Sequence, residues 1–441
     1  MSSVGVPVES ASATPSGSTE GQWRASTLAA FRLCVVYIGL YVLNTQMIST
    51  LVRLPIPPLG MITPVSAFFQ WVGTTVLGIA EPIRTAPTGS GDRMFDWVQA
   101  FSLVLISIVA VVVWSLVDRR RLNYARLHTW FRVFVRFALG TTMVGYGASK
   151  LIPVQMPVVF LTRLVEPFGN FSPMGVLWTS IGAAPAYETF VGSAELLGGF
   201  LLFVPRTALL GALICLMNSI AVFTLNMTYD VPVKLFSFHL ILLSLFLLAP
   251  NVRPLVDLVL LHRSARASAE IAPGKTPQSQ RRWRIAQVVF GVFVVLQAIA
   301  GGVVNWTRFG GGAPKSPLFG IWDVAQMSID GEVRPPLLTD RDRWRRVIFQ
   351  APTAVTFQRM DDSFERYGVT IDTSARTLAV TSIGPKAVST LAFERPSPER
   401  LIVKGPLNGR TVHLELTLRD LNSFLLESRG FHLVQEVPFN R

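Results

Sequence analysis

Charged residues are scarce in this sequence, and cysteine and histidine are scarcer. Only 15% of the 441 residues are Asp, Glu, Lys or Arg, whereas soluble proteins carry about 25%. The two cysteines, Cys34 and Cys215, lie inside apolar runs, and there is no CxxC motif. Neither a zinc site nor thiol chemistry therefore has support, and we expect no metal. The sequence also lacks a nucleophile-base pair and a nucleotide-binding loop, which weighs against a self-sufficient enzyme.

The first 25 residues lack the basic start and short apolar core of a cleaved signal peptide. They are rich in Ser, Thr, Gly and Pro, and they carry Glu9 and Glu20. We therefore predict a disordered tail over 1–25.

The positive charge of the chain is concentrated in its hydrophobic part. The net charge is +13 and half of the residues are apolar. Residues 1–317 hold 24 Lys and Arg against 12 Asp and Glu, whereas residues 318–441 hold 16 against 15. An excess that lies in the apolar part indicates membrane topology, so we expect the lipid bilayer as a partner and no nucleic acid.

Long apolar runs dominate the first 306 residues. A hydrocarbon core roughly 30 Å thick takes about 20 apolar residues of helix. Seven runs of this kind are present, at 28–50, 98–117, 131–152, 184–203, 208–227, 233–249 and 285–306. The sequence predicts a mainly α, polytopic membrane helical bundle of about seven transmembrane helices.

Arg and Lys collect in two loops, at 118–136 and 253–284. Cytoplasmic loops hold such an excess. We therefore predict a multi-pass protein of the cell inner membrane, with the N-terminus in the cytoplasm and the C-terminal domain periplasmic or extracellular.

The uncharged segment 64–80 is interpreted as interfacial; if it spanned the membrane, the N-terminus would lie outside. Short helices at the outer surface are predicted at 158–165 and 173–181.

After residue 306 the pattern changes from helical to β. Glycine and proline indicate a linker at 307–317. Short β-branched runs follow at 347–349, 355–357, 369–372, 378–380, 401–403 and 412–416. We predict seven or eight strands in an all-β sandwich or barrel over 318–441. The remaining domains predicted are two helices with an external loop at 26–130, a four-helix region at 131–250, a basic cytoplasmic loop at 251–284 and a last helix at 285–306.

The fourth run carries two acidic residues, which are costly inside a bilayer. Glu188, Gly192, Glu195 and Gly199 follow a helical spacing that places them on one face. Glu195 is predicted near mid-membrane with no cation level with it, and Glu188 near the outer surface. We expect the two glycines to be close-packing positions.

The third run places Thr142, Tyr146 and Lys150 on one face. An antiparallel arrangement of the helices would bring Lys150 level with Glu188, and Thr142 level with Glu195. Other polar residues predicted in the outer half complete the ligand-binding candidates: Asn218, Asn226, Asp230, Lys234 and His239.

Two interpretations of these residues stay open. They form an outward-facing polar pocket for a quinone headgroup or another small polar ligand, or they are buried pairs that hold the bundle together, Lys150 with Glu188 among them. For Glu195 alone we favour the ligand site. For His239 we favour a hydrogen-bonded packing role.

Region 131–250 resembles the DoxX-like membrane proteins of bacteria, which have a four-helix fold. The matching pieces are YGASKL (146–151), AELLGG (194–199), the turn at Pro205 and Arg206, Asn226, YDVPVK (229–234) and LLAP (247–250). The family includes a subunit of a thiosulfate:quinone oxidoreductase and partners of membrane oxidoreductase complexes. The resemblance implies a redox- or quinone-associated subunit with a redox partner subunit, and quinone is the one cofactor it suggests. The extra helices and the β domain depart from the small members of the family.

The start of the β domain, Gly320-Ile321-Trp322, resembles the opening of a lipocalin-like barrel, in which the Trp plugs the base. Packing of Trp322 in a sandwich core is the alternative. A barrel would receive a lipophilic ligand beside the membrane. The second hypothesis for the whole chain is therefore a non-enzymatic, membrane-anchored binding or assembly protein whose external β domain binds a lipid or protein partner.

Overall fold

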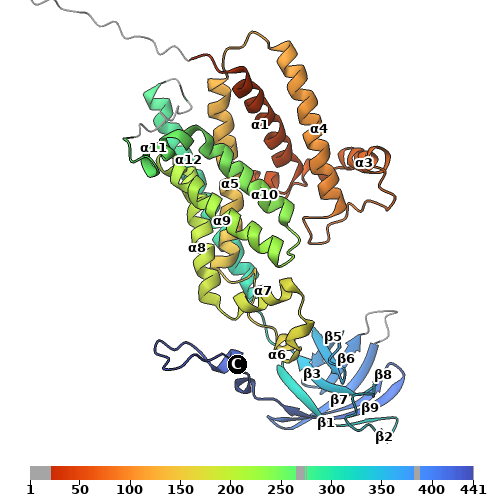
Figure 1. Ribbon diagram of the computed structural model, residues 1–441. Coiled ribbons are helices and arrows are strands. Elements are labelled where there is room, and N and C mark those ends of the chain that lie inside the picture. Colours follow the sequence, from red (N-terminus) through yellow and green to blue (C-terminus); the bar gives the residue numbers. More distant parts are fainter. Residues whose placement is uncertain (1–20, 265–273, 275, 382–387, 441) are drawn as a thin grey trace, which may run out of the picture.

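The computed structural model describes residues 21–264, 274, 276–381 and 388–440. A long helical bundle carries a β-barrel at one end (Figure 1). Residues 1–20 of the predicted tail lie outside the described residues. The prediction of a tail as far as residue 25 is wrong for Trp23, whose backbone N–H donates to the carbonyl of Leu122 at 2.9 Å and whose ring packs edge-on against Phe31.

The bundle is built from long helices connected by short ones. The long helices are α1 (Ala25–Asn44), α4 (Met94–Val117), α5 (Ala125–Leu151), α8 (Pro185–Phe203), α9 (Ala208–Thr228), α10 (Lys234–Leu248) and α12 (Pro277–Phe309). The short ones are α2 (Met47–Val52), α3 (Thr63–Trp71), α6 (Leu161–Val165), α7 (Pro173–Gly182) and α11 (Val252–Val259).

Five helical stretches in the described part of the chain are long and apolar enough to span a membrane. They contain α1, α4, α9, α10 and α12. The helices α5 and α8 coincide with the two other predicted spans, and their passage through a membrane stays a prediction. The short α6 and α7 match the two helices predicted between residues 158 and 181.

Helix boundaries differ from the predicted ones at several places. The helix α5 begins at Ala125, inside the region predicted as a basic loop, and α12 continues to Phe309, into the predicted linker. The first run is divided because the side chains of Asn44 and Thr45 each donate to a carbonyl one turn back, at 2.8 Å, which competes with the helical ladder. Segment 64–80 holds a 9-residue α-helix that begins at Thr63, followed by a 5-residue π-helical turn that ends at Val76. The predicted basic loop 251–284 contains α11 and the start of α12, because Thr276 caps α12 and Pro277 begins it.

The β domain is an eight-stranded antiparallel barrel, which decides between the two predicted architectures. The strands are β1 (Gly320–Ile329), β3 (Trp344–Phe349), β4 (Ala354–Arg359), β5 (Phe364–Asp372), β6 (Thr377–Thr381), β7 (Val388–Ser397), β8 (Arg400–Leu407) and β9 (Arg410–Leu418). Each pairs with the next, and β9 pairs with β1 to close the barrel. The two-residue β2 (Glu332–Val333) extends the β1 edge.

The barrel rests against α6 through residues on its outer face. Ile321 on β1 is the register partner of Ile348 on β3, and both are buried under Leu161 of α6. The amide side chain of Gln358 donates to the carbonyl of Val165 at 3.1 Å. The short helix α6 therefore fixes the barrel to the bundle through both apolar and polar contacts.

Candidate functional site

The ammonium of Lys150 and the carboxylate of Glu195 form a buried ion pair, with 2.5 Å between Lys150 Nζ and Glu195 Oε1. The two residues are 6% and 1% exposed. This geometry corrects two predictions: Glu195 does have a cation beside it, and that cation is Lys150, which was expected to pair with Glu188. A buried carboxylate is costly alone, and the paired ammonium offsets much of that cost.

Glycines on α5 and α8 set the level at which these side chains meet. A Cβ atom added to Gly192 would overlap the backbone N of Leu151 and lie 2.7 Å from the carbonyl carbon of Lys150. Lys150 therefore lies beside Gly192, about one helical turn from each carboxylate. The glycine prediction is confirmed: an added Cβ at Gly199 would lie 2.9 Å from the carbonyl oxygen of Gly140.

Two more predicted residues, Tyr146 and Thr142, line the same face of α5 and contact the start of α2. Gln46 Nε2 donates to the Tyr146 hydroxyl at 3.0 Å. The hydroxyls of Thr142 and Thr50 lie 3.3 Å apart. We did not single out Gln46 or Thr50 from the sequence, although two polar residues at i, i+4 spacing near the end of the first apolar run were an available signal.

Glu188 is buried in the first turn of α8, and no cation of the described residues forms an ion pair with it. Its Oε1 accepts the backbone N–H of Met156 at 3.0 Å. The other carboxylate oxygen, Oε2, is buried and has no hydrogen-bond partner among the described residues, and the same holds for Oε2 of Glu195. Two buried acceptor atoms are therefore left for a hydrogen-bond donor from outside these contacts.

His239 forms a separate cluster with two tyrosines of α1. Its Nδ1 lies 2.7 Å from the carbonyl of Leu235, and its Nε2 lies 2.7 Å from the Tyr37 hydroxyl. Since a carbonyl can only accept, Nδ1 carries the hydrogen, and Nε2 of the neutral ring accepts from Tyr37. The imidazole also stacks on Tyr41, with ring centroids 3.6 Å apart. These contacts are those of a packed, hydrogen-bonded histidine.

The remaining candidates are dispersed. Asn226 is buried and donates to the Ser237 hydroxyl at 3.0 Å. Asn218 is half-buried, and its side chain makes no hydrogen bond with any described residue. Lys234 pairs with the exposed Asp230 at 2.8 Å.

Asp92 joins this surface pair, with 3.9 Å between Asp92 Oδ2 and Lys234 Nζ, and it was not among the predicted candidates. Its two carboxylate oxygens accept the backbone N–H groups of Lys234 and Leu235, each at 2.8 Å, at the N-terminus of α10. Asp92 thus caps a helix from a different loop, which explains why no local pattern marked it.

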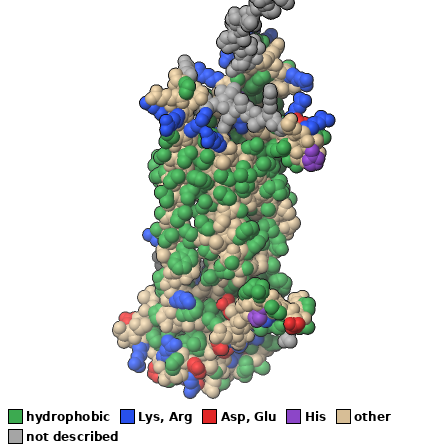
Figure 2. Space-filling view, turned by 90° about the vertical axis from the view of Figure 1, so that its left-hand side faces the viewer, with side chains coloured by type: hydrophobic (Ala, Val, Ile, Leu, Met, Phe, Trp, Pro, Cys, Tyr) green, Lys and Arg blue, Asp and Glu red, His purple; other side chains and the backbone are tan. Residues whose placement is uncertain are grey.

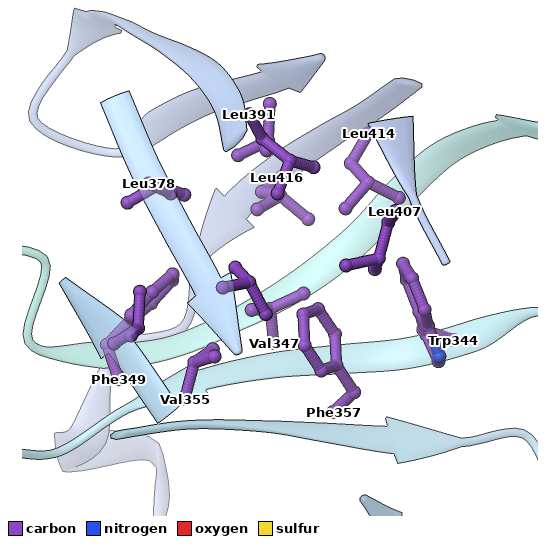
Figure 3. Close-up of a pocket in the computed structure, with 13 residues that line it drawn as sticks. Trp344, Val347, Phe349, Val355, Phe357, Leu378, Leu391, Leu407, Leu414 and Leu416 are labelled. Carbon is purple, nitrogen blue, oxygen red and sulfur yellow. The ribbon is translucent and has the colours of Figure 1, made fainter. Parts of the chain in front are cut away.

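The barrel interior is filled by its own side chains. Figure 3 shows Trp344, Phe357, Leu391 and Leu414 directed toward a common centre. The remaining cavity measures about 20 Å³, room for about one water molecule. Trp322 is fully buried and its indole N–H donates to the carbonyl of Leu318 at 2.9 Å. The interior as it stands has no room for a lipophilic ligand.

The chain thus combines helices of membrane-spanning length and composition with a closed β-barrel. Over 118 residues it is 32% identical to the uncharacterized protein YwoB of Bacillus subtilis, a stretch that makes up 27% of this chain and 72% of that protein. The chain belongs to the family of this protein. No protein-family profile matches it, and no solved structure matches it. Among the described residues, no group of His, Cys, Asp and Glu has the arrangement of a metal site.

Proposed function

We propose that this chain is a seven-span inner-membrane protein in which α5 and α8 cross the bilayer together with the five apolar stretches. Figure 2 supports this topology: a broad apolar belt separates an end rich in Lys and Arg from an end of mixed charge that includes the barrel. The basic end would face the cytoplasm and the barrel would lie outside. The polar cluster around Lys150 and Glu195 then lies within the outer half of the membrane.

We further propose that this polar cluster binds the headgroup of a quinone. The observation that carries the proposal is the buried Lys150–Glu195 pair beside two carboxylate oxygens without a hydrogen-bond donor. Quinone carbonyls accept hydrogen bonds, which Lys150 and Tyr146 are able to donate. Quinol hydroxyls donate hydrogen bonds, which the free oxygens of Glu195 and Glu188 are able to accept. The cluster is therefore chemically suited to both forms of the ligand.

The resemblance to the DoxX-like proteins supports a redox-linked role for such a site. Members of that family serve as subunits or partners of membrane oxidoreductases. We propose that this chain does the same, with the electron donor held by a partner subunit.

The test is to purify the full chain in mild detergent, extract the bound lipid and measure quinone by mass spectrometry. A quinone that co-purifies with the parent, and that falls at least about tenfold in Glu195→Gln, is the expected result. Glu81→Gln, at an exposed loop position, is the matched control. The paired variant Lys150→Gln with Glu195→Gln removes both charges and separates binding from folding. No quinone in the parent, or an equal amount in all variants, contradicts the proposal.

A second function is favoured by a different observation. After the barrel, the C-terminal segment carries four highly exposed apolar side chains: Phe431, Leu433, Val434 and Val437 are 72% to 89% exposed. Arg429 holds this segment in a loop by packing over the ring of Phe439 and donating to Gln435. Exposed apolar groups of this kind mark protein or membrane contacts. Under this alternative the chain is a membrane-anchored assembly protein, and the exposed C-terminal segment, not the barrel interior, contacts its partner.

This alternative is tested by replacing Phe431 and Leu433 with Ser in the full chain and measuring retention of co-purifying proteins by quantitative mass spectrometry. Replacement of Leu337 and Leu338, also exposed and apolar, is the matched control. Loss of a particular protein from the first variant alone supports an assembly role. Unchanged co-purification contradicts it.

A further inference from the structure

A groove between α6 and α7 lies beyond the polar cluster, at the junction of the bundle and the barrel. Its volume is about 200 Å³. The lining side chains are mostly apolar, with one cation and two hydroxyls among them: Phe160, Arg163, Ser172, Met174, Trp178 and Thr179. In Figure 1 these two helices lie between the helical bundle and the barrel, which is the position of a membrane-water boundary in the topology proposed above.

Arg163 is held at the edge of this groove. Its Nη1 bonds to Glu166 at 2.5 Å, and its guanidinium lies 4.8 Å from the ring centroid of Phe171. The opposite nitrogen, Nη2, lies 3.4 Å from the place where a Cβ of Gly175 would be, so the lack of a side chain at Gly175 leaves room beside it. Nε and Nη2 make no hydrogen bond to any residue described. The guanidinium therefore presents two donor nitrogens, Nε and Nη2, with fixed geometry and no acceptor among the described residues.

The surroundings of the groove favour a lipid over a soluble anion. Val158, Phe160 and Phe168 are 47%, 46% and 73% exposed, so apolar side chains project around the groove. Trp178 is half-buried and donates its indole N–H to the carbonyl of Gln155 at 3.1 Å, the amphipathic arrangement that tryptophans adopt at membrane boundaries. A ligand that fits must therefore have an acceptor for a guanidinium at one end and an apolar body at the other.

We propose that the groove between α6 and α7 binds a phospholipid of the outer leaflet. Nε and Nη2 of Arg163 donate to the phosphate, which guanidinium groups recognise through paired hydrogen bonds. The glycerol and upper acyl chain lie along Phe160, Met174 and Trp178. Because α6 also carries the barrel through Leu161, the bound lipid would lie directly beside the attachment of the barrel to the bundle.

The experiment uses the full chain, purified in detergent and stripped of lipid, and counts adducts by native mass spectrometry. Phosphatidylglycerol is compared with diacylglycerol of the same acyl chains, which lacks the phosphate, and with glycerol phosphate, which lacks the chains. We expect phosphatidylglycerol to bind at least about tenfold more tightly than either. Arg163→Gln should lose that advantage, and Arg163→Lys should keep part of it. Arg308→Gln changes an exposed arginine in the last turn of α12, which does not line the groove, and this variant should bind like the parent.

Equal binding of phosphatidylglycerol and diacylglycerol would overturn the proposal, as would parent-like binding by Arg163→Gln. Tight binding of glycerol phosphate without the lipid would also overturn it, since the site would then be an anion site. Thermal melting establishes that each variant is folded. If Arg163→Gln does not fold, Gly175→Leu decides, because its side chain fills the groove while Arg163 stays; adducts equal to those of the parent would then reject the site.

Discussion

The hydroxyl of Tyr37 lies 2.7 Å from Nε2 of His239, and this contact joins α1 to α10. The two residues are 202 positions apart in the sequence. The neighbouring Tyr41 stacks on the imidazole at a centroid distance of 3.6 Å. One side of the first helix is thereby fixed to the four-helix region by a polar contact within an apolar environment.

Tyr37→Phe should destabilise the bundle by about 1 to 3 kcal/mol, because it leaves Nε2 of a buried histidine without a donor. His239→Leu should cost a similar amount, and the double variant should cost less than the sum of the two. The measurement is a double-mutant cycle of detergent unfolding. Tyr229→Phe is the control, since its hydroxyl has no hydrogen bond within the described chain. Additive effects of the two substitutions would show that the contact contributes nothing.

Removal of one member of the Lys150–Glu195 pair should be much more damaging than removal of both. Lys150→Met or Glu195→Gln should cost about 3 to 5 kcal/mol, because a buried charge is left alone. The paired variant Lys150→Met with Glu195→Met should lie within about 1 to 2 kcal/mol of the parent. The surface pair Asp230 and Lys234 is the control and should be worth about 0 to 1 kcal/mol. If the paired variant is no more stable than the single variants, an isolated buried charge is not the cause of their loss of stability.

The helices and strands were predictable from the sequence because their signals are local. Apolar runs of about 20 residues mark the helices α1, α4, α9, α10 and α12, and β-branched alternation marks the strands. The choice between sandwich and barrel was not local, because it depends on the pairing of β1 with β9 across the whole domain.

The partner of Lys150 was predicted wrongly for a physical reason. A lysine side chain reaches about one helical turn in either direction, and Lys150 lies between Glu188 and Glu195 on the neighbouring helix. Which of the two carboxylates pairs with Lys150 depends on the backbone contacts of Gly192 and on the N–H of Met156, which already donates to Oε1 of Glu188. Such partners come from tertiary packing, as does the cap that Asp92 provides for α10.

Asp92→Ala should destabilise the protein by about 1 to 2 kcal/mol, because two backbone N–H groups at the start of α10 lose their acceptor. Asp92→Asn should cost less, since an amide oxygen still accepts one of these bonds. Hydrogen exchange at the first turn of α10 is the measurement. Exchange there should rise in the Ala variant and change little in Glu81→Ala, at an exposed loop position. Equal protection in all three variants would rule out the capping role.

The close contact of α5 with α8 predicts opposite results for two glycines of α5. Gly147→Ala should destabilise the bundle by about 1 to 3 kcal/mol, because the new Cβ would overlap the backbone N of Leu196. Gly145→Ala meets no atom within 4 Å and should be neutral or stabilising by up to about 1 kcal/mol, since alanine favours the helix. Unfolding in detergent compares the two. A neutral Gly147→Ala variant would mean that the helices lie further apart.

The attachment of the barrel to α6 predicts that the barrel depends on the bundle for stability. Leu161 is 4% exposed and covers Ile321 and Ile348. Leu161→Asp should bury a charge against these residues and weaken the attachment by about 2 to 4 kcal/mol. Hydrogen exchange should then rise in β1 and β3, whereas Val333→Asp, at a position 76% exposed on β2, should leave it unchanged.

By the same argument a fragment that starts at Leu318 exposes this apolar patch and should aggregate more readily than one fused to residues 158–166. Unchanged exchange in Leu161→Asp, together with a soluble isolated barrel, would show that α6 only touches the barrel and does not stabilise it.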